Sequence, residues 1–262
     1  MSRLPNRKLL DKIDRNLLRE LIRAKLKATD YDSIFGLFWS LIGPLLLLVV
    51  MYLIFRQRFG QKVYAYPLYL LLGIVCVNFF VASTGHLIRM FLVNRDTMLN
   101  VAMHREILVL SEFFIHTYKF LIELTLCCGL SVFYGLFSWK GLLLSLPLIL
   151  AYLGFVLGIG LALSLVYCFS RDIGHVWGLV TRLLYFVTPV FYTMNSISPL
   201  AKKAVYWLNP LTQFTISFHE IFMGKGKINL LIYLHAMFLG AFYFTLGYLL
   251  FRLFETKGIE RI

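Results

Sequence analysis

Four polar side chains recur at helical spacing in a stretch that is otherwise largely apolar. They are Glu112, His116, Lys119 and Glu123. Spacings of four, three and four residues place them on one helix face, and Lys119 can pair with Glu123. Intramembrane charge is costly and usually faces a bundle interior or a water path. The face is therefore either a polar strip toward a lumen or a neighbouring subunit, or the start of a helix that stands in the cytoplasm before it enters lipid.

Other patterns that carry chemistry are missing from the sequence. There is no GxxxxGK[ST] phosphate loop, no HExxH and no GxSxG. The histidines show no pairing at metal-ligand spacing: His86, His104, His116, His175, His219 and His235. The cysteines read as free thiols in or beside apolar runs: Cys76, Cys127, Cys128 and Cys168. We therefore predict no catalytic residue, no metal ligand and no cofactor in this chain.

The elements that must position the polar face are predicted to be transmembrane helices. The 262 residues are 60% hydrophobic and only 15% charged, whereas a soluble domain carries roughly 25% charged residues. Uncharged runs approach or exceed the roughly 20 residues that a helix needs to cross the hydrocarbon core. The predicted fold is an all-α integral membrane protein with six transmembrane helices. These cover approximately 33–55, 66–90, part of 107–137, 142–169, 176–192 and 229–250. The first apolar run is too long for a cleavable signal, so we expect that helix to be retained.

The N-terminal segment has a different pattern. Basic residues recur every three or four positions, and apolar residues recur on another face. This predicts a cationic amphipathic helix that lies on an anionic membrane surface, with Arg15, Arg19 and Arg23 at the interface. The alternative is an ordinary solvated helix. The predicted division is residues 1–32, the cytoplasmic interface helix, and residues 33–262, the six-span domain.

The segment 193–228 is less apolar than the spans around it. Its short apolar stretches cannot cross a bilayer. They predict two short helices, broken at Asn209 and Pro210, that lie at the membrane surface or re-enter it.

The formal charge of +13 comes from 26 basic and 13 acidic residues. The basic residues gather beside apolar spans. This favours a role in orienting the chain in the membrane over a role in binding nucleic acid. The segments 1–32, 89–105 and 171–182 and the tail from 252 hold about twice as many Lys and Arg as the opposite segments. Both termini are therefore predicted to be cytoplasmic.

Three segments resemble, in order, motifs of the permease subunits of ATP-binding-cassette (ABC) polysaccharide exporters. The first is Ser33-Ile34-Phe35-Gly36-Leu37-Phe38-Trp39 followed by Pro44. The second is Phe169-Ser170-Arg171-Asp172, and the third joins Thr188-Pro189-Val190-Phe191-Tyr192 to Leu208-Asn209-Pro210-Leu211. The start of the second span, at residues 63–74, resembles that of O-antigen polysaccharide permeases in particular. Phe35 and His104 depart from the residues, Leu and Pro, that the family often carries there.

The resemblance implies a homodimer of six-span subunits in the inner membrane, with two copies of a separate ABC ATPase that binds ATP and Mg. It implies export of a lipid-linked polysaccharide, as in lipopolysaccharide biosynthesis. The loop at about 94–106 would hold the helix that couples to the ATPase, and the short helices around 199–223 would be external gate elements. The coupling residues implied are Asn94, Arg95, Asp96, Arg105 and Glu106. The gate and loop motif residues implied are Arg171, Asp172, Pro189, Tyr192, Asn209 and Pro210.

Two other functions stay open. A permease of the same superfamily could export teichoic acid, capsule, a drug or a lipid. A membrane-embedded transferase acting on lipid-linked sugars would need a polar catalytic cluster, and only Asp172 and the Glu112 to Glu123 face are candidates. That scarcity argues against the transferase.

Overall fold

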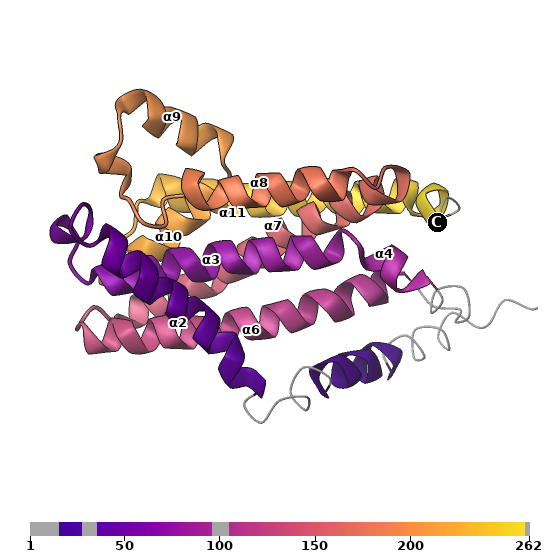
Figure 1. Cartoon of the computed structure of the whole chain (residues 1–262), viewed down its shortest axis with the longest axis horizontal. Helices are drawn as coiled ribbons and strands as arrows, with labels where there is room; N and C mark the ends of the chain where they lie inside the picture. The colour runs from indigo at the N-terminus through magenta and orange to yellow at the C-terminus, as the bar shows by residue number, and fades with distance from the viewer. Residues whose placement is uncertain (1–15, 28–35, 96–104, 260–262) are drawn as a thin grey trace, which may run out of the picture.

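Every regular element in the described part of the chain is a helix (Figure 1). The computed structural model describes residues 16–27, 36–95 and 105–259. Residues 16–27 form an N-terminal helix. The following elements are α2 (Gly36–Phe55), η1 (Gly60–Lys62), α3 (Tyr66–Leu87), α4 (Met90–Val93), α6 (Glu106–Phe133), α7 (Trp139–Phe169), α8 (Ile173–Val187), η2 (Met194–Ser196), α9 (Pro199–Leu208), α10 (Leu211–Met223) and α11 (Leu230–Ile259). The predicted all-α class is confirmed.

Three of the described helices are long and apolar enough to cross a membrane. They are Tyr66–Leu87, Trp139–Phe169 and Leu230–Phe254. Two shorter apolar helical segments cover Leu41–Phe55, which is part of α2, and Ile173–Val187, which is α8. Large apolar side chains on the outside of the bundle, such as Leu53 and Leu231, are mostly exposed, as a lipid-facing surface requires. The count of six spans stays a prediction.

Two helix ends differ from the predicted ones by five residues or more. The helix expected over 176–192 ends at Val187, because a residue before proline disfavours helical backbone; Thr188 is extended, with φ −81° and ψ 141°. The last helix, expected to stop near 250, continues to Ile259. Its extension contains neither glycine nor proline before Gly258, so loss of hydrophobicity alone does not end it.

Helix α3 forms the centre of the bundle. It contacts α2, α6, α7, α8 and α10, and all of its residues from Leu70 to Val77 are buried. A helix that is apolar on every side is stable only when other helices cover every side. The apolar composition of α3 therefore explains its position at the centre of the bundle.

Helices α7 and α11 pack backbone against backbone along their length. A Cβ atom at Gly158 of α7 would collide with the carbonyl oxygen of Tyr243 on α11. A Cβ atom at Gly240 of α11 would likewise meet the carbonyl of Ala151. Small residues allow this close approach, which is typical of helix pairs in membranes.

The break between two short helices at Asn209 and Pro210 is confirmed, but the two helices have different surroundings. Helix α9 exposes Leu200, Trp207 and Leu208. Helix α10 packs against α3, α7 and α11, and its Phe214 and Phe218 are fully buried. Helix α10 is therefore enclosed by other helices of the bundle. Its placement at the membrane surface or re-entering the membrane stays a prediction.

The bundle has two distinct ends (Figure 1). The terminal end carries α4 and the C-terminal end of α11, with the N-terminal helix 16–27 alongside this half of the bundle; the far end carries η1, η2 and α9. Helix α3 runs from the far end to the terminal end, and α6 returns in the opposite direction beside it.

Candidate functional site

The polar face predicted on α6 is turned toward α3. His116, Lys119 and Glu123 line a cavity of about 70 Å³ together with Asn78 and Ala82 of α3. Glu112, at the start of the face, pairs with a side chain of α3 as well. The face therefore lies in the seam between two packed helices, and Glu123 is 9% exposed at its deep end.

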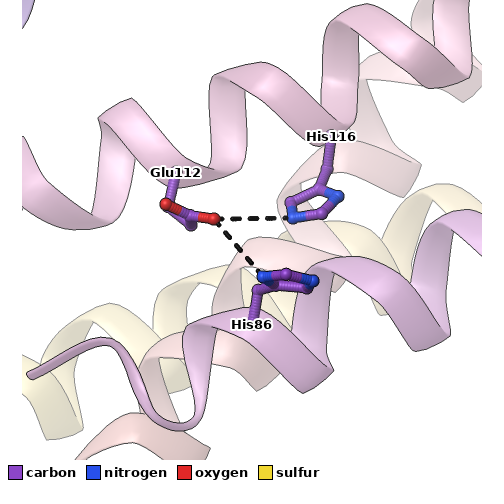
Figure 2. A group of neighbouring side chains, drawn as sticks. All are labelled: His86, Glu112 and His116. Carbon is purple, nitrogen blue, oxygen red and sulfur yellow. Dashed lines mark ion pairs between the residues drawn. The ribbon is translucent and has the colours of Figure 1, made fainter. Parts of the chain in front are cut away.

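Glu112 is the centre of a cluster that joins three helices, and Figure 2 shows its members on α3 and α6. Its Oε1 atom lies 3.5 Å from Nδ1 of His86 on α3 and 3.8 Å from Nε2 of His116 on α6. Its Oε2 atom accepts a 2.5 Å hydrogen bond from the Lys25 amine of the N-terminal helix. Lys25 also donates to the hydroxyl of Ser111, at 3.3 Å. One carboxylate thus holds two imidazoles on one side and an ammonium group on the other.

A cavity of about 290 Å³ adjoins this cluster at the terminal end of the bundle. Its lining includes His86, Arg89, Asn94 and Glu112. Asn94 donates from Nδ2 to the carbonyl of Met90 at 2.9 Å, which closes α4. The cluster therefore stands beside the start of the predicted coupling loop.

The predicted coupling residues occupy both sides of a gap in the described chain. Arg95 is exposed and Asp96 lies outside the described residues. Arg105 precedes α6 as its N-cap, and Glu106 forms a 3.2 Å ion pair with Arg252 of α11. The described members therefore lie at the terminal end, where α6 is tied to α11.

Two of the predicted motif segments meet at the far end of the bundle. The hydroxyl of Tyr69 donates to the carbonyls of Tyr192, at 2.7 Å, and Pro189, at 3.2 Å. The hydroxyl of Tyr66 donates to the carbonyl of Phe191 at 2.7 Å. A Cβ atom at Gly73 would lie only 2.9 Å from Cα of Val190. The extended segment after α8 is therefore fixed against the start of α3.

Asn209 connects the same segment to α10. It is 3% exposed. Its Nδ2 donates to the hydroxyl of Thr188 at 2.9 Å, and its Oδ1 accepts from the backbone N–H of Leu211 at 3.1 Å. His219 of α10 stacks on Tyr69 with ring centroids 3.8 Å apart. The polar groups of Pro189, Tyr192 and Asn209 thus belong to one packed region, and Pro210 is the N-cap of α10.

The remaining predicted residues lie elsewhere. Arg171 and Asp172 are exposed in the turn between α7 and α8, and the Asp172 carbonyl accepts from His175 and Val176 as α8 begins. Arg15 lies outside the described residues. Arg19 is exposed, and Arg23 pairs with Glu20 at 3.2 Å on the exposed side of the N-terminal helix.

Sequence reasoning missed Lys25 and His86 as members of the cluster. The position of Lys25 could have been noticed in the sequence. Leu17, Leu21 and Lys25 are spaced by four residues, so Lys25 places a cation on the apolar face of the helix. The helix packs Leu21 against the core, so that row faces protein. Nothing in the sequence indicated His86, since a single histidine near the end of an apolar run forms no local pattern.

The chain is similar to known membrane transport proteins. Residues 17–223 match the family described as ABC-2 type transporter. The O-antigen export system permease protein RfbA of Klebsiella pneumoniae is 26% identical over 215 residues, which cover 82% of both chains. The protein of the same name from Myxococcus xanthus is 26% identical over 209 residues, covering 79% of this chain and 80% of that one.

Proposed function

Because the chain belongs to the ABC-2 type transporter family, we propose that it is the permease of an exporter that moves a lipid-linked, O-antigen-like polysaccharide across the inner membrane. As a permease of this family it is a multi-pass membrane protein without an ATPase domain, and its ATPase is a separate partner. One observation carries the choice of substrate. The similarity to two O-antigen export permeases runs through about four fifths of each chain.

In this proposal the six spans are α2, α3, α6, α7, α8 and α11. Helix α6 has 28 residues and is about 42 Å long at 1.5 Å per residue. It therefore exceeds the roughly 30 Å hydrocarbon core. The terminal end, with the N-terminal helix, is cytoplasmic, as the excess of basic residues favours. The helix 16–27 stands beside the cytoplasmic half of the bundle (Figure 1), where the exposed Arg19 and Arg23 would reach anionic headgroups.

The exposed side chains of helix α8 support the proposal that the permease is a homodimer. Leu179, Leu183 and Phe186 are each more than 60% exposed, and Arg182 is exposed among them. Arg182 lies nine positions after Ile173, about 14 Å along the helix. An arginine at that depth is unfavourable in lipid and normally faces protein or water. A second copy against this face would give Arg182 a polar path on the dimer axis.

Energy would enter at the terminal end. The segment from Asn94 to Glu106 would contact the ATPase, which binds ATP and Mg. Movement of the ATPase would displace this segment and the attached helix α6. The Glu106–Arg252 ion pair would transmit the displacement to α11. At the far end, α9 and α10 would act as gate elements, held by the network of Tyr192 and Asn209.

The test is to co-express the chain with its candidate ATPase, purify the complex and measure ATP hydrolysis with and without lipid-linked glycan. We expect a complex of two permeases and two ATPases by mass, with hydrolysis stimulated by the glycan. Teichoic acid, capsule precursors and simple lipids serve as competing substrates. Absence of a complex, or stimulation only by a competing substrate, would contradict the proposal.

A further inference from the structure

Two histidines and a glutamate converge between α3 and α6 in a way that suits metal coordination (Figure 2). One possible ligand atom from each of His86, Glu112 and His116 lies within 4.8 Å of the other two. Within residues 16–27, 36–95 and 105–259, no other His, Cys, Asp or Glu residues form such a group. Glu112 and His116 are four residues apart on one helix face, and His86 comes from the helix opposite.

Two of the three separations are close to those of a coordinated ion, and the third, between the two imidazoles, is within 4.8 Å. Ligands about 2.0–2.1 Å from a tetrahedral zinc ion stand roughly 3.3 Å apart. Glu112 Oε1 is 3.5 Å from His86 Nδ1 and 3.8 Å from His116 Nε2. The His86 side chain is 62% exposed, so it is free to turn by the remaining distance.

The carboxylate is oriented for this role. Oε1 faces both imidazoles, while Oε2 is held by the Lys25 amine at 2.5 Å. A carboxylate that binds a metal through one oxygen commonly receives a hydrogen bond on its other oxygen, which fixes its direction. Lys25 would fill that second position.

His116 supplies an independent observation. Its side chain is 10% exposed, yet its Nε2 atom is buried and has no hydrogen-bond partner. A buried polar atom without a hydrogen-bond partner is unfavourable. This atom points toward Oε1 of Glu112 (Figure 2). A metal ion between them would satisfy it.

We propose that His86, Glu112 and His116 bind a divalent transition-metal ion of the Zn²⁺ class. Two nitrogen donors and one oxygen donor suit zinc and its neighbours rather than Mg²⁺ or Ca²⁺. The adjoining cavity, lined by His86 and Glu112, gives water access to a fourth position. Lys25 and Arg89 add positive charge nearby, so the affinity is lower than that of a four-ligand structural zinc site. The ion would fasten α3 to α6 beside the coupling loop.

The test uses the full chain, purified in detergent with a tag that contains no histidine. Co²⁺ is titrated at pH 7.5 and followed by its visible absorption, and Zn²⁺ is titrated by calorimetry. We expect one ion per chain and a higher melting temperature with Zn²⁺. His86→Ala should weaken binding at least tenfold, and so should Glu112→Gln. His175→Ala, which removes an exposed imidazole on α8, should leave binding unchanged.

His86→Ala is the decisive variant, because the exposed side chain is removed without opening the core. Its melting temperature without metal should equal that of the parent chain, which shows that it is folded. If the parent chain binds no Co²⁺, or if folded His86→Ala binds it as the parent does, the cluster is an ion-pair network and the proposal is wrong. Binding is measured without ATPase or glycan, so the result does not depend on the proposed transport function.

Discussion

Asn209 shows how one residue can connect a loop motif to the packing of a membrane bundle. It is buried at the break between α9 and α10 and uses both ends of its amide: Nδ2 donates to Thr188, and Oδ1 accepts from Leu211. Proline at the next position supplies no backbone N–H. The Asn209 side chain therefore helps to stabilise the break between the helices, together with Thr212 and Gln213, which donate to the carbonyls of Val205 and Tyr206 on α9.

Asn209→Ala should lower the stability of the purified chain by about 1–3 kcal/mol, because it leaves the buried hydroxyl of Thr188 without its partner. The matched control is Asn195→Ala, which removes an exposed amide that pairs with Lys202 and should change stability little. The melting temperature in detergent is the measurement. Equal melting temperatures for the two variants would show that the Thr188–Asn209 link contributes nothing.

At the same scale, sequence reasoning found one half of the α6 cluster and not the other. Helical spacing predicted that Glu112, His116, Lys119 and Glu123 share a face, and that face is a property of one segment. Lys25 pairs with Glu112 across 87 positions of sequence, and His86 belongs to another helix. Such pairings depend on how helices pack, which the spacing within a single helix does not encode.

At the scale of the elements, the pairing of α7 with α11 depends on glycine. Gly158 faces the backbone of Tyr243, and Gly247 faces the backbone of Gly158 itself. Lipid supplies no hydrophobic driving force between helices, so close van der Waals packing must hold the pair. Any side chain at these positions separates the two helices.

Gly158→Ala should therefore destabilise the chain, although alanine is by itself the better helix former by about 1 kcal/mol. Gly129→Ala on α6 is the control, since a Cβ atom there meets nothing within 4 Å, and it should be neutral or slightly stabilising. Melting temperature and the monodispersity of the purified protein report the difference. A Gly158→Ala variant as stable as Gly129→Ala would contradict close packing of the pair.

The elements themselves were largely predictable. Hydrophobic runs located the long helices, and Asn209-Pro210 located the break between α9 and α10. The burial of α10 was not predicted, because a short apolar segment suits both the membrane surface and the interior of a bundle. The distinction comes from its partners α3, α7 and α11.

At the scale of the whole molecule, we expect the two ends of the bundle to face opposite sides of the membrane. Single cysteines at Lys202 on α9 and at Arg95 after α4, both exposed, can be labelled with a membrane-impermeant maleimide. Cys128 and Cys168 are partly exposed and are first replaced, whereas Cys76 and Cys127 are buried and are retained. In spheroplasts, Lys202→Cys should react, and Arg95→Cys should react only after permeabilisation. The reverse pattern would invert the proposed orientation.

The proposed function is export of a lipid-linked glycan by this permease together with its ATPase. Its most direct test is ATP-driven movement of that glycan into the lumen of inside-out membrane vesicles, followed by its protection from an added glycosidase. The control is a complex whose ATPase lacks its phosphate-binding lysine. The expected result is protection that requires ATP and both proteins. Glycan that stays accessible with ATP and both proteins present would contradict it.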